Sequence, residues 1–339
     1  MLFQRNAWYV AALSSHIGRD PVRRIILGEP ILLYRKDAGD VAAMFDRCPH
    51  RFAPLSRGTR QGDNIECKYH GLMFNSGGQC VLNPHGDVIA PGLHVRAYPL
   101  HEQYGFVWVW MGVREYADHG LIPDLGYMIA EGTRSAHSYV NVNYRYDILV
   151  DNLMDLSHVE YLHSGSFATS PAESGETIVE TTDSTVTVKR MQYVAPPPPR
   201  HSHLPNPCDM MFTIKWHPGN VIIFKWFGVE SGGDINNGLL LDEFAHIVTP
   251  ETEKSVNYFM SISRYEDLDS EEMDKRLSDY QVGVIQSEDS PMLLAIDQEM
   301  DGADLLEMRP VILPVDKGAL QVRRLIKRLT NLEATEQEN

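Results

Sequence analysis

Two short segments, each with one cysteine and one histidine, constrain the fold of this chain more than any other feature. Cys48-Pro-His50 is followed after 16 residues by Cys67-Lys-Tyr-His70, and turn-forming residues surround both segments. Zinc also binds Cys₂His₂ sets, but zinc fingers usually place both Cys on one arm and both His on the other. A cluster with two thiolates on one iron and two imidazoles on its second iron needs both residue types from each of two opposed loops. The mixed arms therefore favour an iron–sulfur cluster, with structural zinc as the alternative.

A second polar segment, Asp151-Asn-Leu-Met-Asp155-Leu-Ser-His158-Val-Glu-Tyr-Leu-His163, interrupts an apolar helical pattern. On a helix, Asp151, Asp155 and His158 would share one face, because steps of three and four residues bring side chains together. The two histidines would not share it, since five residues correspond to roughly 500° of rotation. If both bind one metal, the helix must distort or end between them, and a bulged turn is one way to do so. The alternative is a hydrogen-bonded polar seam, because two His lack the third ligand of a metal site.

Charge and cysteine content narrow the class of protein. The 339 residues suggest two domains. Lys plus Arg number 30 against 46 Asp plus Glu, a net charge of −16, which argues against a nucleic-acid-binding surface but does not forbid an anionic substrate in a local pocket. The start is not that of a signal peptide, and no run approaches the roughly 18 apolar residues of a spanning helix. Four cysteines in such a chain suggest reduced thiols or metal ligands, and a cytoplasmic location is expected.

The order of the elements is also predictable in outline. Residues 1 to about 112 form short alternating runs broken by Gly, Pro and Asp, which is typical of a small antiparallel sandwich. A strand over 137–146 leads into the polar helix, and later runs predict strands at 177–193, 211–216, 221–229, 239–248 and 255–263. A helix is expected from about 269 to 300, with Pro291 as a possible kink, and an amphipathic helix carries Leu320 to Leu329. The proline-rich loop 195–208 is interpreted as an extended connector in which His201 and His203 are solvated, although they could edge a site entrance.

The Cys-x-His-x16-Cys-x2-His pattern resembles the Rieske [2Fe–2S] motif. Together with Asn152-x2-Asp155-x2-His158-x4-His163, it resembles the oxygenase component of a Rieske non-haem iron oxygenase. The opening Asn6-Ala-Trp-Tyr-Val-Ala and the Cys-Pro-His-Arg-x-Ala-Pro-Leu run are similar to the O-demethylase branch, and the resemblance runs from about residue 3 to about 328. It implies an α+β fold: an all-β Rieske domain over 1–115, then a catalytic domain over 116–339 with a curved antiparallel sheet covered by helices, of the helix-grip, START-like type.

The resemblance also assigns residues. The cluster ligands would be Cys48, His50, Cys67 and His70. The mononuclear Fe(II) would bind His158, His163 and Asp289, with Glu288 as the alternative carboxylate. Two residues of the motif, Asn152 and Asp155, are counted as catalytic: the Asp155 carboxylate would join His158 to His70 of a neighbouring subunit in a homotrimer and carry electrons between the centres.

The implied reaction is O₂- and NAD(P)H-dependent O-demethylation of a methoxylated aromatic acid with release of formaldehyde; hydroxylation or N-dealkylation of another aromatic compound is the alternative. His246 and Tyr280 match substrate-contacting positions of the branch, where Tyr280 replaces a tryptophan. The chain has no Gly-x-Gly-x-x-Gly after a strand, so NAD(P)H and flavin should bind a separate reductase, with or without a ferredoxin. A Rieske electron carrier without oxygen chemistry is disfavoured, because a carrier needs only the first domain and neither His158 nor His163.

Overall fold

The structure of the protein is a computed structural model that describes residues 3–163, 173–197 and 201–338. The chain forms two compact units. The first contains Phe3–Ile122 and the short segment Thr249–Glu253, and the second contains Pro123–Val248 and the residues from 254 onward. None of the helices in the described ranges is long and apolar enough to span a bilayer.

The first unit is built from three small antiparallel sheets, as the short alternating runs predict. Their strand orders are β1-β10-β9, β2-β3-β4 and β5-β6-β7-β8. The bounds are β1 (Trp8–Leu13), β2 (Val22–Ile26), β3 (Glu29–Arg35), β4 (Val41–Phe45), β5 (Thr59–Gln61), β6 (Asn64–Glu66), β7 (Met73–Phe74), β8 (Cys80–Leu82), β9 (Leu100–Gln103) and β10 (Phe106–Trp110).

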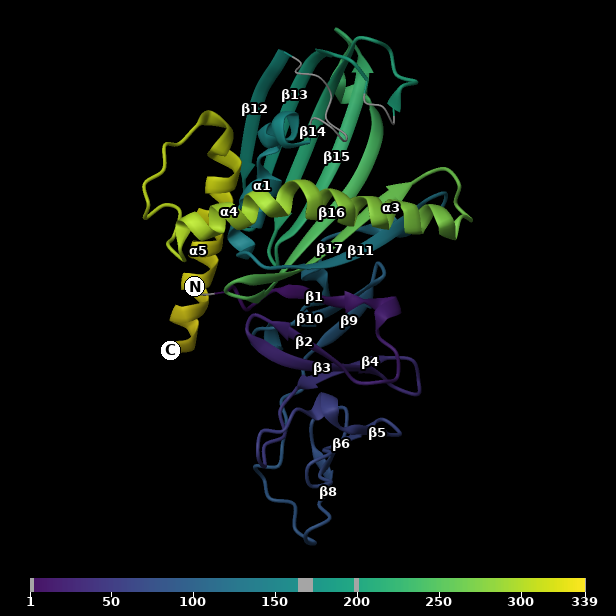
Figure 1. The fold of residues 1–339 in the computed structure, drawn as a ribbon, viewed down its shortest axis with the longest axis vertical. Coiled ribbons are helices and arrows are strands. Elements are labelled where there is room, and N and C mark those ends of the chain that lie inside the picture. The colour runs from purple at the N-terminus through teal and green to yellow at the C-terminus, as the bar shows by residue number, and fades with distance from the viewer. Residues whose placement is uncertain (1–2, 164–172, 198–200, 339) are drawn as a thin grey trace. The chain divides into compact units, whose positions relative to one another are not determined.

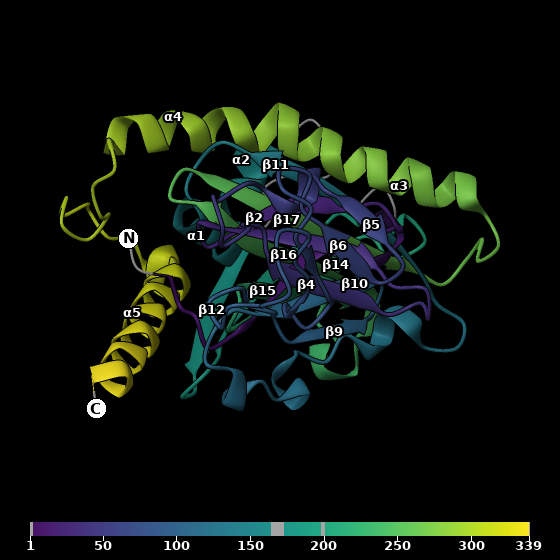
Figure 2. The same cartoon turned by 90° about the horizontal axis from the view of Figure 1, so that it is seen from below.

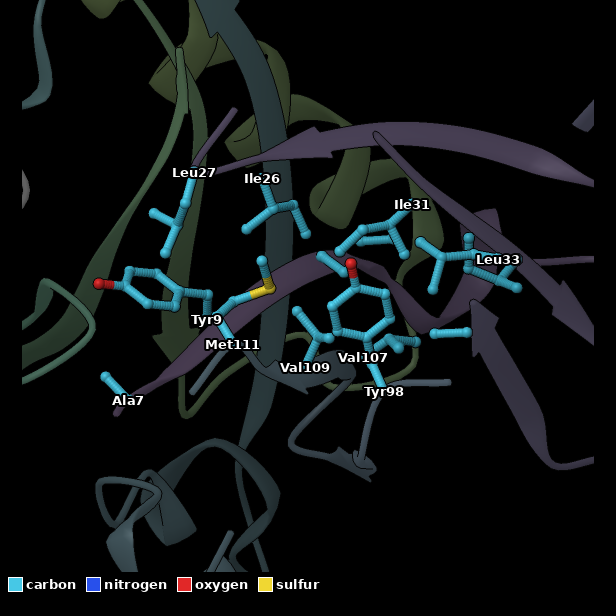
Figure 3. Close-up of a cluster of buried hydrophobic side chains, with 14 residues drawn as sticks. Ala7, Tyr9, Ile26, Leu27, Ile31, Leu33, Tyr98, Val107, Val109 and Met111 are labelled. Atoms are coloured by element: carbon cyan, nitrogen blue, oxygen red, sulfur yellow. The ribbon is translucent and has the colours of Figure 1, made fainter. Parts of the chain in front are cut away.

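The core of the first unit lies between two of these sheets. Figure 3 shows Tyr9 of β1 and Val109 of β10 beside Ile26 of β2 and Ile31 of β3, all of them almost fully buried. Each such side chain stabilises the fold by about 1.5–3 kcal/mol relative to its exposure to water. The segment Thr249–Glu253 belongs to this unit because its carbonyl groups accept hydrogen bonds from the N–H groups of Leu27 and Gly28.

The second unit is organised around a seven-stranded antiparallel sheet in the order β11-β17-β16-β15-β14-β13-β12. The expected run 177–193 is two strands rather than one, because the chain turns at 182–185. The bounds are β11 (Arg134–Val142), β12 (Glu173–Thr181), β13 (Val186–Ala195), β14 (Cys208–His217), β15 (Val221–Glu230), β16 (Leu239–Thr252) and β17 (Ser255–Arg264).

Helices cover one face of this sheet, so the expected α+β architecture with a helix-covered antiparallel sheet is confirmed (Figures 1 and 2). They are α1 (Tyr146–Met154), α2 (Val159–Leu162), α3 (Glu271–Val284), α4 (Ser290–Met300) and α5 (Lys317–Glu338). Ser270 begins α3 by accepting a hydrogen bond from the Met273 N–H at 3.1 Å. Figures 1 and 2 show α3 and α4 running end to end along the sheet.

Between α3 and α4 lies a π-helical turn, η9 (Ile285–Asp289), and Pro291 is in the first turn of α4. A proline inside a helix has no N–H, and its ring would clash with the carbonyl of the residue four positions earlier. The π-helical turn interrupts the regular α-helical hydrogen bonds just before Pro291. The predicted helix to about residue 300 is therefore present, but its irregularity precedes Pro291.

Two candidate metal centres

The two Cys/His loops of the first unit have matching backbone geometry. In each loop the Cys N–H donates to the carbonyl five residues later, and the Cys carbonyl accepts from the N–H four residues later. The four bonds measure 2.7–2.9 Å (Cys48 with Ala53 and Phe52, Cys67 with Leu72 and Gly71). The fourth residue after each Cys is left-handed, with φ 61° at Phe52 and 70° at Gly71. Such matched turns place one Cys and one His from each loop opposite the other pair.

The side chains of these loops fit a metal cluster. Cys48 and Cys67 are buried, and the His50 and His70 rings lie 4.5 Å apart between centroids. Burial, with Cys67 nearby, raises the pKa of the Cys48 thiol to about 11. The buried Nδ1 of His70 has no hydrogen-bond partner among the described residues. A cluster would deprotonate the thiols and take up this nitrogen.

In the second unit, the structure brings His158, His163 and Asp289 together. One nitrogen of each ring and one carboxylate oxygen all lie within 4.8 Å of one another. Asp289 Oδ1 is 3.4 Å from His163 Nε2 and 3.8 Å from His158 Nε2, and the two rings are 5.3 Å apart. His163 and Asp289 are buried, whereas His158 is half-buried. Two imidazoles and one carboxylate on one side of a shared point can hold a non-haem iron and leave positions open for other ligands.

The backbone departs from regular α-helix in the segment that carries His158 and His163 and in the segment that carries Asp289. α1 ends at Met154, and Asp155 is extended, with φ −124° and ψ 102°. A 3₁₀ turn (Leu156–His158) and the short α2 then lead to His163. The prediction that Asp151, Asp155 and His158 share one helix face is therefore wrong, because the helix stops before Asp155. A bulged turn is present at the site, but it is the π-helical turn that carries Asp289.

Hydrogen bonds fix the orientation of both imidazoles. His158 Nδ1 donates to the backbone carbonyl of Asp155 at 2.5 Å, and His163 Nδ1 lies 2.5 Å from Glu288 Oε2. Each ring is thereby left with Nε2 on the side of Asp289. Burial lowers the pKa of His158. Burial also acts to lower the pKa of His163, but its hydrogen bonds to Asp289 and Glu288 raise it overall.

The Asp155 carboxylate contacts neither His158 nor His163 in the described hydrogen bonds. It accepts from the backbone N–H and the hydroxyl of Ser157, both at 2.8 Å, and so caps the 3₁₀ turn before His158. Asn152 contacts the predicted ligand set directly, because its Nδ2 donates to Asp289 Oδ1 at 3.1 Å. Glu288, the alternative carboxylate, contacts His163 Nδ1 through its Oε2.

His246 lies on the helix-covered face of the sheet. Ser138 on β11 donates to Gln281 of α3, and Val140, two residues along, is the cross-strand neighbour of Tyr258. Because side chains alternate along a strand, Tyr258 faces the same helices. Its hydroxyl is hydrogen-bonded to His246 Nδ1, and burial lowers the pKa of His246 to about 4.

Aromatic rings extend this face beside His246. Phe224 and Phe244 stack at 4.9 Å, and both contact the His246 ring. The alternation of β15 and β16 contained this signal, but the sequence did not show which rings would meet. Tyr280 lies on α3 with 48% of its surface exposed, and no described contact joins it to His246, so its substrate role stays a prediction.

The interpretation of His201 as solvated is wrong. His201 is 7% exposed, and its Nε2 lies 2.6 Å from Asp242 Oδ2 on β16. The buried Asp242 carboxylate pairs with this imidazole, because a buried charged group needs a polar partner. His203 is exposed, as expected. Residues 198–200 of the same loop lie outside the described residues.

The contact that attaches α2 to the sheet was not predicted from the sequence. Glu160, between His158 and His163 in the sequence, accepts hydrogen bonds from Arg190 at 2.8 Å and from Gln192 at 3.2 Å. Both partners belong to β13, so α2 is attached to the sheet by a partly buried ion pair. A lone Glu within a helix gives no sequence signal for such a distant partner.

Comparison with known proteins places these centres in a family. The Rieske [2Fe-2S] domain matches residues 7–99, and the Vanillate O-demethylase oxygenase C-terminal domain matches residues 142–332. The oxygenase component of dicamba O-demethylase from Stenotrophomonas maltophilia is 37% identical over 98% of this chain and 100% of that protein. This chain belongs to the Rieske oxygenases. As a member, it is the terminal oxygenase of a Rieske monooxygenase, an oxidoreductase that incorporates O₂.

One further relative and one solved structure also match nearly the whole of this chain. The oxygenase component of chloroacetanilide N-alkylformylase from Rhizorhabdus wittichii is 33% identical over 96% of this chain and 95% of that protein. A crystal structure of dicamba monooxygenase with non-heme iron and dicamba matches with a TM-score of 0.85 at 35% identity, covering 99% of this chain and all of that chain. The cofactors are accordingly a Rieske [2Fe–2S] cluster and a mononuclear iron, and NAD(P)H acts through a partner reductase.

Proposed function

We propose that this Rieske oxygenase removes the methyl group of a methoxylated aromatic acid by oxidation and releases formaldehyde. The observation that carries the proposal is the His246–Tyr258 pair beside the stacked Phe224 and Phe244. Stacked rings bind a flat aromatic group, and a buried polar group among them orients it. The 37% identical relative is a dicamba O-demethylase component, which supports the same reaction type.

His246 would donate a hydrogen bond to the substrate. The Tyr258 hydroxyl is fully buried, and a buried O–H needs an acceptor. We therefore assign its proton to the bond with His246 Nδ1, because no other described group contacts this hydroxyl. The imidazole is neutral near pH 7, since burial lowers the pKa of His246 to about 4. Its remaining proton is then on Nε2, where it can bind a carboxylate or phenolic oxygen.

The ligand assignments complete the proposal. Cys48, His50, Cys67 and His70 would hold the cluster, and His158, His163 and Asp289 would hold the iron. When bound, the iron supplies the O₂ chemistry that oxidises the methyl group. The protein holds His158 through the Asp155 carbonyl and orients Asp289 through Asn152. The domain boundaries, 1–115 and 116–339, are part of the same proposal.

Electrons would pass between neighbouring subunits of a homotrimer, from the cluster to the iron through Asp155. A reductase, with or without a ferredoxin, would supply them. Mixing a His70→Ala variant, which lacks the cluster, with a His158→Ala variant, which lacks the mononuclear iron, tests this route. Each should be inactive alone, and activity should return in mixed trimers. Mixed trimers that form by native mass spectrometry and stay inactive would exclude transfer between subunits.

N-dealkylation or hydroxylation of another aromatic is the second candidate, favoured by the 33% identical N-alkylformylase component. A substrate panel with a surrogate reductase distinguishes the two. Methoxybenzoates should give equal amounts of hydroxybenzoate and formaldehyde, and N-methyl anilides should give neither the demethylated anilide nor formaldehyde. The reverse pattern would replace the first proposal with the second. The His246→Leu variant should raise KM for methoxybenzoates more than it lowers kcat.

A further inference from the structure

We propose that Glu288 is a positioning residue that holds His163 in the tautomer and orientation that iron requires. The inference rests on the proposed iron site and adds a residue that does not bind iron. Glu288 Oε2 lies 2.5 Å from His163 Nδ1, while Asp289 Oδ1 lies 3.4 Å from Nε2 of the same ring. Two consecutive carboxylates thus contact the two nitrogens of one imidazole.

Regular helix geometry does not favour this arrangement. Consecutive side chains on an α-helix point about 100° apart, so two neighbouring carboxylates would not ordinarily reach the same ring. Here both residues lie in the π-helical turn Ile285–Asp289. Turns of this kind occur frequently at functional sites. The π turn therefore gives adjacent residues two roles: Asp289 faces the shared point of the ligand atoms, and Glu288 faces the far side of His163.

The two imidazoles are held differently. His158 Nδ1 donates to a backbone carbonyl, a neutral group that no substitution removes. His163 Nδ1 donates to a carboxylate, which is a stronger acceptor because it is charged. A carboxylate on the distal nitrogen fixes the tautomer of a metal-binding histidine and makes its other nitrogen more basic. Of these two hydrogen-bond acceptors, only the Glu288 carboxylate can be removed by a substitution.

Metal affinity tests the role without relying on turnover. Protein stripped of mononuclear iron, with its cluster intact, is titrated with Fe(II) and separately with Co(II), whose visible bands report ligand geometry. Glu288→Ala should weaken binding of both metals by about 10–100-fold and shift the Co(II) bands. Glu288→Gln keeps an acceptor oxygen but loses the charge, so its affinity should fall between those of Glu288→Ala and the wild type. The matched control is Glu299→Gln on the exposed surface of α4, which should bind as wild type.

The comparison with His163→Ala separates two failures. If Glu288→Ala binds both metals as wild type does, while His163→Ala does not, Glu288 has no positioning role and the iron site stands. If His163→Ala also binds as wild type, the assignment of the iron site itself is wrong. Cluster absorbance and thermal unfolding establish that each variant is folded. Should Glu288→Ala fail to fold, Glu288→Gln decides: affinity equal to wild type, with unshifted Co(II) bands, overturns the proposal.

Discussion

The Nδ2 of Asn152, in the last turn of α1, donates a hydrogen bond to Asp289 Oδ1 at 3.1 Å. The same oxygen is the one nearest to both histidine Nε2 atoms. Asn152 therefore links the helix that precedes the two histidines to the π turn that carries the carboxylate, and it limits rotation of the Asp289 side chain.

Replacing Asn152 by Ala should loosen Asp289 without removing any ligand. The expected result is about 10–100-fold weaker Fe(II) binding, because groups that orient a metal ligand typically contribute that much. Iron analysis after exposure to a chelator measures the change. The control is Asn331→Ala on the exposed surface of α5. Full retention of iron in Asn152→Ala would show that Asp289 is held by other contacts.

Arg323 of α5 should be essential for the stability of α1. Its guanidinium contacts both Asp151 oxygens at 2.6–2.9 Å and Asp147 at 3.0 Å. Arg323→Met leaves two carboxylates without this cation, and burial already raises the pKa of Asp151 to about 6. We expect a loss of about 3 kcal/mol in free energy of unfolding, the low end for a broken buried pair, since 22% of the Asp151 side chain is exposed. Urea unfolding measures it, and the exposed neighbour in Arg324→Met should change little.

Acid should destabilise the fold through three half-buried histidines. Burial lowers the pKa of His137, His217 and His246 to about 4, whereas an unfolded His titrates near 6.5. Between these values the unfolded chain binds more protons, so the free energy of unfolding falls as pH falls from about 6.5 to 4. Replacing His217 by Gln should remove about one proton from this dependence, at most about 1.4 kcal/mol per pH unit. Unfolding curves at several pH values test this, with exposed His203→Gln as the control; an unchanged slope in His217→Gln would contradict it.

Asp155 can act as a cap of the 3₁₀ turn and as part of the electron route, and two substitutions distinguish these roles. Its carboxylate caps the turn through Ser157, and we propose that it also carries electrons to His158. Asp155→Asn should retain both metal centres yet transfer electrons from cluster to iron at least about 100-fold more slowly, as stopped-flow oxidation of the reduced cluster would show. Ser157→Ala loses part of the cap and should transfer electrons almost normally. Equal slowing in both variants would mean that Asp155 acts only as a cap.

Much of the site was predictable because its signals are local. The mixed Cys48/His50 and Cys67/His70 arms indicate a cluster by composition and spacing alone. Strand alternation and the helix expected from about residue 269 likewise correspond to elements that the structure contains. The carboxylate near residue 289 depended on the family resemblance, because an acidic pair on a helix is otherwise typical of exposed surface.

What could not be predicted depends on contacts distant in sequence. The chain leaves the helix at Asp155, although the preceding helical pattern continues past it. His201 is buried beside Asp242 of a later strand, and its Nε2 lies 2.6 Å from the Asp242 carboxylate. The partnership of His163 with Glu288 depends on a π turn, which no spacing rule signals. In each of these places tertiary structure overrides the local pattern.

The number of iron atoms per chain tests the central claim most directly. A two-iron cluster and a separate mononuclear site predict about three irons per wild-type chain, with Rieske absorbance. Asp289→Ala should lose about one iron and keep the absorbance, and Cys67→Ala should lose about two irons and all of the absorbance. If Asp289→Ala retains its full iron content while Glu288→Ala loses one iron, the carboxylate assignment is wrong. If wild type contains zinc in place of cluster iron and is colourless, there is no Rieske centre and the account fails.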